Sequence, residues 1–209
     1  MLIYSIPVSL YCAKLRVLLR HKELAWEEAP PPGGYGSDAY KTVVPSGNLP
    51  ALVDDDLLLA DSEAIAEYLE ERHPQPPMLP GDAAARAKIR ELSRFHDTRL
   101  EPALRAVFPY MPGRSTPPDG FLAAQSDAIS ARLSQLAQML APDTGDVLTL
   151  GDCGCPITFA WMDRLTPLMG LQINWPGPVQ DYRGRLGLHP AISKELSDYT
   201  PKLDAFLAG

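Results

Sequence analysis

Residues that hold metals or form disulfides are scarce in this chain. Three cysteines, Cys12, Cys153 and Cys155, are an odd number in 209 residues, and only one residue separates the last two. That spacing is too short for a zinc knuckle, and an odd number of cysteines does not make a disulfide framework. The four histidines stand singly and form no metal-binding spacing. We therefore expect neither structural disulfides nor a metal site.

Basic charge and long apolar runs are also in short supply. Lys and Arg number 19 against 26 Asp and Glu, which gives a formal net charge of -7 at pH 7. This balance excludes an extensive basic surface for nucleic acid or for an anionic membrane. No apolar run approaches the roughly 18 residues of a membrane span, and no basic segment precedes Leu2 to begin a secretion signal. We expect a cytoplasmic protein with a small-molecule ligand and with no nucleic-acid or membrane partner.

Proline, in contrast, is abundant, at 22 of 209 residues, against an average near 5%. Four prolines fall in residues 73–82, so this segment can form neither a helix nor a central strand. We predict that residues 76–82 link two domains. The first would span residues 1–75 and the second residues 83–209.

Strand and helix patterns alternate before this linker. Short apolar runs bounded by turn residues predict strands at residues 2–5, 24–27, 49–53 and 57–60. Apolar residues at helical spacing predict helices at residues 11–22, 37–42 and 61–73. The resulting order is βαβ, a short helix and then ββα, which describes an α/β domain.

Strand patterns are absent after the linker. Helices are predicted from Asp82 towards Phe108, at residues 121–140 and 155–169, and around Tyr182 and Ala191. Residues 149–152 have the sequence Thr-Leu-Gly-Asp, which is the pattern of a capping box. The second half is thus predicted to be an all-α bundle.

Ser9 stands where the first predicted strand gives way to the first helix. A helix N-terminus carries unpaired N–H groups and the positive end of the helix dipole, and both favour a bound anion such as a thiolate. Serine is also a common N-cap residue, a role that needs no ligand. Cys12 lies three residues further on, on the apolar face of the helix, where burial as a small hydrophobic residue explains it.

Two later stretches have the chemistry of an amino-acid receptor. Pro50 follows a turn at the start of a strand, and a cis bond there would expose the main chain of Leu49 to a ligand. An ordinary trans proline at a strand edge is the alternative. At Asp61-Ser62, a hydroxyl and helix N-terminal amides suit a carboxylate, and the aspartate suits an ammonium group. Asp-Ser is also a frequent helix cap.

In their order and spacing, these stretches resemble the cytosolic glutathione transferase superfamily in its serine-type, bacterial form, with no class assigned. The resemblance covers essentially the whole chain and is most specific around Leu49-Pro50 and Asp61-Ser62. It extends to residues 149–152, which match the capping box of the family's C-terminal domain. It implies a thioredoxin-like domain followed by an α-helical bundle. It also implies glutathione as co-substrate, no metal, and a homodimer.

The resemblance implies that Ser9 activates a thiol. Serine-type members carry the catalytic hydroxyl at this position, where glutaredoxin-like relatives carry a nucleophilic cysteine. A hydroxyl cannot form a mixed disulfide, so the replacement argues against thiol exchange and for stabilising the thiolate of bound glutathione. Cys12 and Tyr11 are the alternatives. Cys12 matches the second cysteine of the glutaredoxin motif, and tyrosine-type members place their tyrosine nearer the end of the first strand.

The resemblance also implies which residues hold the rest of glutathione. Leu49 would pair its main chain with the cysteinyl part, beside a cis-Pro50. Ser62 and the main chain around it would receive the γ-glutamyl carboxylate. Asp61 would lie near the α-ammonium group. These roles agree with the amino-acid receptor inferred from the residues themselves.

Three features depart from the family pattern. Asn48 stands where many serine-type members carry a lysine that meets the glycyl carboxylate of glutathione, and Lys41 or Tyr40 is a possible substitute. Leu10 replaces the proline that often follows the catalytic serine. Residues 30–36, rich in proline and glycine, form an unusual loop whose path the sequence does not predict.

We expect a glutathione transferase, in which the glutathione thiolate attacks an electrophilic carbon of a small hydrophobic co-substrate. The alternatives on the same fold are a maleyl-type isomerase, a dehalogenase, a peroxidase or a non-catalytic binding module. The candidates for the co-substrate site are Tyr11, Arg94, Phe95, Arg99, Phe108 and Tyr110. Arg94 and Arg99 would favour an anionic co-substrate if they faced the cleft.

Overall fold

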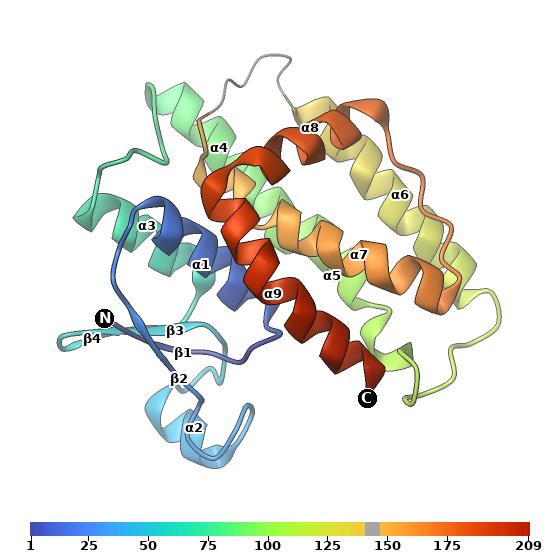
Figure 1. The fold of residues 1–209 in the computed structure, drawn as a ribbon, viewed down its shortest axis with the longest axis horizontal. Helices are drawn as coiled ribbons and strands as arrows, with labels where there is room; N and C mark the ends of the chain where they lie inside the picture. The colour runs from blue at the N-terminus through green and yellow to red at the C-terminus, as the bar shows by residue number, and fades with distance from the viewer. Residues whose placement is uncertain (141–146) are drawn as a thin grey trace.

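The computed structural model describes residues 1–140 and 147–209, and its first half contains a four-stranded sheet (Figure 1). The strands are β1 (Leu2–Tyr4), β2 (Glu27–Ala29), β3 (Ala51–Asp54) and β4 (Leu57–Leu59). They lie in the order β2-β1-β3-β4, with β2 parallel to β1 and the other two pairs antiparallel. This mixed sheet confirms the predicted thioredoxin-like α/β domain.

Helices cover both faces of this sheet. They are α1 (Leu10–His21), α2 (Asp38–Val43) and α3 (Ser62–Arg72). Figure 1 shows α1 and α3 on one face and α2 on the other. Because side chains alternate along a strand, Ile3 and Leu52 enter the main core with α1, whereas Ala51 packs with Tyr40 of α2.

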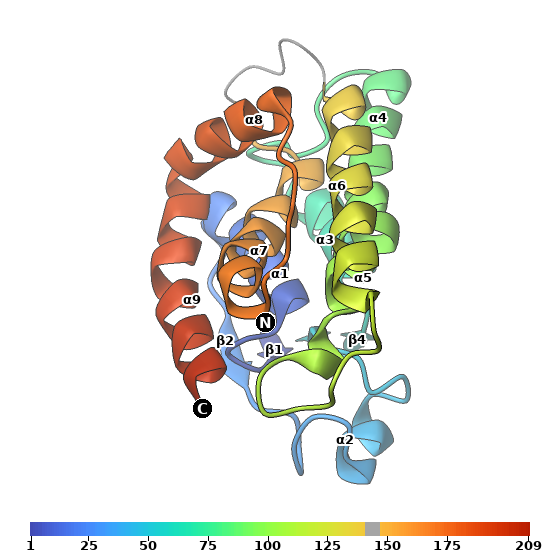
Figure 2. The ribbon, with the colours of Figure 1, turned by 90° about the vertical axis from the view of Figure 1, so that its right-hand side faces the viewer.

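The second half of the chain contains only helices among the described residues. They are α4 (Ala83–Phe95), η1 (His96–Leu100), α5 (Glu101–Arg105), η2 (Phe108–Tyr110), α6 (Phe121–Met139), η3 (Leu150–Asp152), α7 (Cys155–Met169), α8 (Gly177–Leu188) and α9 (Pro190–Ala208). Figure 2 shows α1 and α7 in the middle of the molecule, with α9 on one side and α4 and α6 on the other. One continuous core joins the halves, from Ile3 to Leu203. The predicted all-α second half is confirmed.

The strand predicted at residues 24–27 is wrong by three residues, because β2 begins at Glu27. The N–H of Leu24 donates to the carbonyl oxygen of Leu19 at 3.0 Å, so Leu24 closes the end of α1 instead of entering the sheet. The ladder begins where Glu27 N donates to the carbonyl oxygen of Met1 at 3.1 Å. Leu24 and Trp26 are partly buried against the main core and do not pair in the sheet.

The long helix predicted from Asp82 towards Phe108 is interrupted. Asp82 does cap α4, because its Oδ1 accepts a hydrogen bond from Ala85 N at 2.9 Å. The helix then becomes π-helical in η1 before α5 begins. Pro102 has no N–H to donate to the carbonyl of Thr98, so the α-helical ladder cannot continue unchanged through this point.

Residues 73–82, between α3 and α4, are packed against the first half. Met78 is fully buried, and its N–H donates to Glu70 Oε1 at 3.0 Å. Lys22 Nζ, at the end of α1, lies 2.6 Å from Glu70 Oε2. A carboxylate of α3 thus ties this connection to α1. That residues 76–82 separate two domains stays a prediction.

The described part of the chain holds no helix that is long and apolar enough to span a membrane. Among the same residues, no three His, Cys, Asp or Glu side chains are grouped to bind a metal ion. All three cysteines are buried and free of disulfide bonds.

Two histidines at the end of α1 and the start of α9 predict a loss of stability in mild acid. The rings of His21 and His189 lie 5.1 Å apart. Burial, and then the charge of His189, lower the pKa of His21 below 6.5, and burial lowers that of His189 too. The contribution of the two histidines to the free energy of unfolding is therefore fully present above pH 6.5. It is lost as the pH falls from 6.5 through the lower pKa of the folded state.

Chemical denaturation at several pH values between about 5 and 8 measures this loss. The variant His21→Gln removes one titrating group and leaves His189, which caps α9 by accepting from Ala191 N. We expect the variant to lose less stability than the wild type on acidification. An equal loss in both proteins would contradict the assignment to this pair.

Candidate active site

A cavity of about 740 Å³ lies between the sheet domain and the helical half. The first half lines it with residues that follow β1 or precede α2, β3 and α3: Ile6, Val8, Ser9, Leu10, Tyr11, Tyr35, Asn48, Leu49, Asp61 and Ser62. The second half lines it with Arg94, Asp97, Arg105, Phe108, Met111, Arg114, Trp161 and Phe206. A polar end and an aromatic end therefore face the same space.

Ser9 caps α1 at the edge of this cavity. Its Oγ accepts a hydrogen bond from Cys12 N at 3.2 Å, and its carbonyl oxygen accepts one from Ala13 N at 3.0 Å. The other N–H groups of the first helical turn have no partner within the helix. The Ser9 hydroxyl has one proton to donate, which it can direct either to the buried Cys12 thiol or to an anion in the cavity.

Asp61 and Ser62 form a second helix N-terminus on the cavity. Asp61 Oδ1 caps α3 by accepting from Glu63 N at 2.9 Å and from Ala64 N at 3.0 Å. The other oxygen of this carboxylate, Oδ2, takes no part in the cap. Ser62 is the first residue of α3 and is largely buried at the cavity wall. A negative charge and a hydroxyl thus stand side by side, the arrangement that an amino-acid head group requires.

The main chain before β3 reaches the cavity beside a cis-proline. The bond between Leu49 and Pro50 is cis, as the family resemblance implies. Asn48 and Leu49 line the cavity, whereas Pro50 is buried behind it. Tyr40 and Lys41 do not line it: Tyr40 is fully buried with its hydroxyl donating to Asn48 O at 2.7 Å, and Lys41 is exposed. Tyr40 therefore fixes Asn48 in place and does not itself reach a ligand.

Tyr11 and Cys12, the alternatives to Ser9, are both engaged elsewhere. Tyr11 lines the cavity, but its hydroxyl donates to Glu101 Oε2 at 3.0 Å. Burial and the charges of Glu101 and Asp97 raise the pKa of Tyr11 well above its ordinary value. Cys12 is only 1% exposed, and burial raises the pKa of its thiol despite the opposing hydrogen bond from Ser9. Both groups therefore stay protonated at neutral pH.

This burial predicts that the folded protein has no fast-reacting thiol. Cys12, Cys153 and Cys155 are all buried, and burial raises the pKa of each, that of Cys155 to about 12. Thiolates, not thiols, react with alkylating and disulfide reagents. Titration with an aromatic disulfide reagent should therefore detect close to no thiol in native protein and all three in denaturant. One thiol that reacts rapidly in the native state would show that this account of Cys12 is wrong.

Aromatic side chains form the far wall of the cavity. Phe108 stacks on Trp161, with ring centroids 4.6 Å apart and an interplanar angle of 28°. Phe206 meets Trp161 edge-on at 6.1 Å. The guanidinium of Arg105 lies 5.7 Å from the ring centroid of Tyr11 and 5.2 Å from that of Phe108. Such a wall suits a planar apolar group that carries some negative charge.

The structure divides the predicted co-substrate residues in half. Three of them line the cavity: Tyr11, Arg94 and Phe108. Three do not: Phe95, Arg99 and Tyr110. Phe95 packs against the main core, Tyr110 packs on Phe121, and Arg99 is exposed. Helical spacing alone does not state which face of α4 and η1 meets the first half of the chain.

Sequence reasoning missed six cavity residues that carry distinct chemistry: Tyr35, Asp97, Arg105, Arg114, Trp161 and Phe206. Tyr35 belongs to the proline- and glycine-rich loop whose path was not predicted. Trp161 and Phe206 come from α7 and α9, far along the chain, and reach the cavity through tertiary packing. No local pattern in the sequence distinguishes them from core residues.

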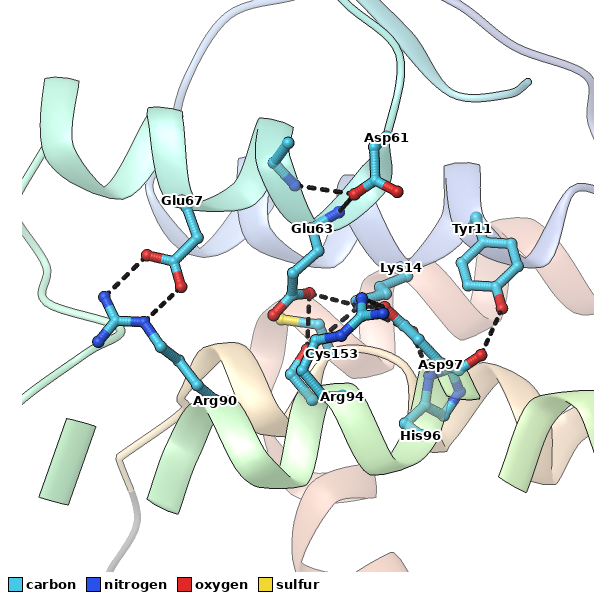
Figure 3. Close-up of polar contacts among 12 residues, drawn as sticks. Tyr11, Lys14, Asp61, Glu63, Glu67, Arg90, Arg94, His96, Asp97 and Cys153 are labelled. Atoms are coloured by element: carbon cyan, nitrogen blue, oxygen red, sulfur yellow. Dashed lines mark hydrogen bonds and ion pairs between the residues drawn. The ribbon is translucent and has the colours of Figure 1, made fainter. Parts of the chain in front are cut away.

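A buried charge cluster, here called the Lys14 cluster, lies behind the cavity (Figure 3). Lys14 Nζ of α1 lies 2.8 Å from Glu63 Oε2 of α3 and 2.8 Å from Asp97 Oδ2 of η1, and donates to Ser93 Oγ of α4 at 3.2 Å. His96 Nδ1 lies 2.8 Å from Asp97 Oδ1. Burial alone would raise the pKa of Asp97, but His96 and Lys14 lower it. The cluster therefore joins α1 and α3 to the first helix of the second half by charge.

The mixed sheet, the cis-proline beside the cavity and the helical half together define the glutathione transferase fold, a thioredoxin-like domain joined to an α-helical one. Residues 3–77 match the family model described as "Glutathione S-transferase, N-terminal domain". Residues 3–77 therefore belong to the glutathione transferase N-terminal family, and the chain as a whole has the fold of this superfamily, with no class assigned.

Similar proteins carry several names. Over 92 residues the chain is 39% identical to a stringent starvation protein A homologue of Pasteurella multocida, which covers 44% of this chain and 43% of that protein. Over 108 residues it is 35% identical to a maleylacetoacetate isomerase of Pseudomonas aeruginosa, which covers 49% and 51%. A solved structure of maleyl pyruvate isomerase, a bacterial zeta-class enzyme, matches with a TM-score of 0.70 at 25% identity, over 93% of this chain and 96% of that chain. The chain spans about half the length, or less, of the curated relatives that it matches.

Proposed function

We propose that this protein binds glutathione and transfers it to an electrophilic co-substrate, with Ser9 as the group that stabilises the thiolate. The observation that carries this proposal is the position of Ser9 Oγ, which lines the cavity while it accepts the Cys12 N–H at 3.2 Å. The cap holds the hydroxyl at the positive end of α1 before any ligand arrives. A donor that is already in place does not need to reorganise as charge develops on sulfur.

The rest of glutathione fits the polar end of the cavity by its charges. The α-ammonium group would meet the free oxygen of Asp61, and the γ-glutamyl carboxylate would meet Ser62 and the first amides of α3. The main chain of Leu49 would pair with the cysteinyl part. The glycyl carboxylate would extend towards Asn48 and Tyr35, which line the cavity near this end.

The proposed chemistry begins with loss of the thiol proton to water. The sulfur then attacks an electrophilic carbon of a co-substrate seated against Phe108 and Trp161. The carbon–sulfur bond forms as the leaving group departs with its bonding electrons. A hydrogen bond to a charged group contributes about 1.5–3 kcal/mol, and this is the share of the barrier that Ser9 would supply.

A second candidate is a glutathione-dependent isomerase that acts on a maleyl-type substrate. Arg94, Arg105 and Arg114 line the cavity, and a guanidinium group suits an anionic co-substrate. Arg94 pairs with Asp97 and Arg105 with Glu101, so Arg114 is the strongest candidate of the three. Two of the similar proteins are named as isomerases of maleyl compounds. In such a reaction the thiolate would add to the double bond and leave again after rotation, so Ser9 would keep its role. Dehalogenase and peroxidase activities on the same glutathione site are further alternatives.

Assembly and location are part of this proposal. Glutathione transferases are typically dimers, and we propose that this protein is a cytoplasmic homodimer. Light scattering of the purified protein measures its mass in solution. A monomer at working concentration would contradict the proposed homodimer.

Calorimetric titration with glutathione tests the binding site. The wild type should bind, and Asp61→Asn should weaken binding by about 2- to 5-fold, the effect of losing one exposed charge pair. Asparagine is as good an N-cap as aspartate, so α3 keeps its cap in this variant. Absence of glutathione binding by the wild type would overturn the proposal and favour a non-catalytic binding module.

A panel of co-substrates then separates the reactions. It contains an aromatic electrophile, a maleyl compound, a halogenated compound and a hydroperoxide, each tested with glutathione. Turnover of the aromatic electrophile supports transfer. Turnover of the maleyl compound alone would replace transfer with isomerisation.

A further inference from the structure

A hydrogen-bond chain connects the aromatic wall of the cavity to the loop that carries Ser9. Trp161 Nε1 of α7 donates to Tyr199 Oη of α9 at 2.7 Å. Tyr199 Oη in turn donates to the carbonyl oxygen of Val8 at 2.9 Å. Trp161 and Tyr199 are both buried, with exposed fractions of 2% and 1%. The last acceptor belongs to the residue immediately before Ser9.

The direction of each hydrogen bond in this chain is fixed by chemistry. An indole N–H can only donate, and a carbonyl oxygen can only accept. The single hydroxyl proton of Tyr199 must therefore point at Val8, while the oxygen accepts from Trp161. Burial raises the pKa of Tyr199, so this proton stays in place at neutral pH. The two hydrogen bonds from Trp161 through Tyr199 to Val8 therefore have only one possible direction. A residue that holds another group in place needs such a fixed arrangement.

Val8 has few other restraints from the helical half. The loop from β1 to α1 is held at its start by Ser5 N, which donates to Ala29 O at 3.0 Å within the sheet domain. It is held at its end by Ser9 N, which donates to Ile6 O at 3.1 Å within the loop itself. Among the hydrogen bonds of the described residues, the one from Tyr199 joins residues 6–8 to the helical half.

We propose that Tyr199 is a positioning residue that places the Ser9 hydroxyl against the sulfur of glutathione by holding the carbonyl of Val8. This inference rests on the proposed function of Ser9. Tyr199 does not touch the ligand, because it does not line the cavity. Val8 and Ser9 are consecutive residues, so a shift of the Val8 carbonyl is passed on through the main chain. Such a shift would move the Ser9 hydroxyl away from the sulfur.

The test is the pKa of glutathione bound to the protein, measured from the ultraviolet absorbance of its thiolate across pH. In Tyr199→Phe, which keeps the ring and loses the hydroxyl, this pKa should rise by about 0.5–1 unit and kcat/KM should fall roughly 3- to 10-fold. Tyr182→Phe is the matched control. The Tyr182 hydroxyl is also buried and donates to Asp152 Oδ1 at 2.7 Å, but it has no contact with the Ser9 loop.

A double-mutant cycle with Ser9→Ala shows whether Tyr199 acts through Ser9. Once the hydroxyl of Ser9 is gone, adding Tyr199→Phe should change the thiolate pKa no further. A pKa that rises equally in Tyr182→Phe, or that rises again in the double variant, would overturn the inference. If Tyr199→Phe does not fold, Tyr199→Gln, which is too short to reach both partners, is measured with the same expectation.

The wild-type protein separates this inference from the function on which it rests. A thiolate signal in the wild type that Tyr199→Phe leaves unchanged would overturn the positioning role alone. No thiolate signal in the wild type would overturn both.

Discussion

Replacing Ser9 with alanine is expected to lower kcat/KM with glutathione by roughly 10- to 150-fold. The estimate follows from the loss of one hydrogen bond to a charged group, about 1.5–3 kcal/mol. The hydroxyl sits at the N-terminus of α1, where its oxygen is already engaged by Cys12 N and its proton can be directed to an anion in the cavity. Nothing in alanine replaces that donor, so the thiolate would keep only the amides of the first turn.

The variant also loses a helix cap, so the effect on activity needs a control for the effect on folding. Removing a serine cap costs about 0.5–2 kcal/mol of stability. Ser37→Ala is matched, because Ser37 caps α2 by accepting from Tyr40 N at 3.0 Å and does not line the cavity. We expect this control to keep near-wild-type kcat/KM. Full activity in Ser9→Ala, with a loss in Cys12→Ala, would show that the thiol of Cys12 and not Ser9 serves catalysis.

Replacing Lys14 with methionine is expected to lower the free energy of unfolding by about 3–5 kcal/mol. Lys14 is 3% exposed and is the ammonium group between Glu63 and Asp97, whose side chains are also largely buried. Methionine fills similar space, but it leaves Glu63 in the interior without its cation and leaves Asp97 with only Arg94 and His96. The cost comes from this loss of charge compensation, and for that reason it exceeds the net contribution of the intact ion pairs.

Urea denaturation measures this difference, and an exposed lysine of α4 provides its control. Lys88 pairs with Glu91 at 2.7 Å on the exposed face of α4. Lys88→Met should change stability by no more than about 0.5 kcal/mol, because exposed pairs contribute little. Equal effects of the two substitutions would contradict the account of the Lys14 cluster as the buried connection between α1, α3 and α4.

Local chemistry explains why the polar end of the cavity was predictable from the sequence. Serine and aspartate are common helix-capping residues, and Ser9 and Asp61 each precede an apolar helical pattern. Ser9 does cap α1, and Asp61 does cap α3. Pro50 stands at a turn before a strand, and its bond is cis as the family resemblance implied. Each signal depends on neighbours within a few residues, which a sequence displays directly.

The aromatic end depends on tertiary packing and was only half predictable. Arg94 reaches the cavity and Arg99 does not. Residues five apart lie on different sides of an α-helix, and the sequence alone does not state which side meets the first half. Trp161 and Phe206 belong to α7 and α9, which are far from Ser9 in the sequence. No local sequence pattern indicates that these helices pack beside Ser9. The chain from Trp161 through Tyr199 to Val8 spans 191 residues at its last hydrogen bond, beyond any local pattern.

The boundary errors have the same origin. Leu24 and Trp26 have strand-like apolar character, but the sheet pairs only from Glu27 onward, where the chain comes alongside Leu2 of β1. The partner strand decided the register there. In the same way, Tyr40 was a candidate ligand by position, yet its hydroxyl is used within the fold by Asn48 O.

An ultraviolet difference titration of the protein with glutathione near neutral pH, with Ser9→Ala and Ser37→Ala in parallel, measures the bound thiolate itself. We expect a saturable thiolate signal in the wild type and in Ser37→Ala, and a much weaker signal in Ser9→Ala. A thiolate signal of equal size in Ser9→Ala, or none in the wild type, would contradict the claim that Ser9 stabilises the thiolate of bound glutathione.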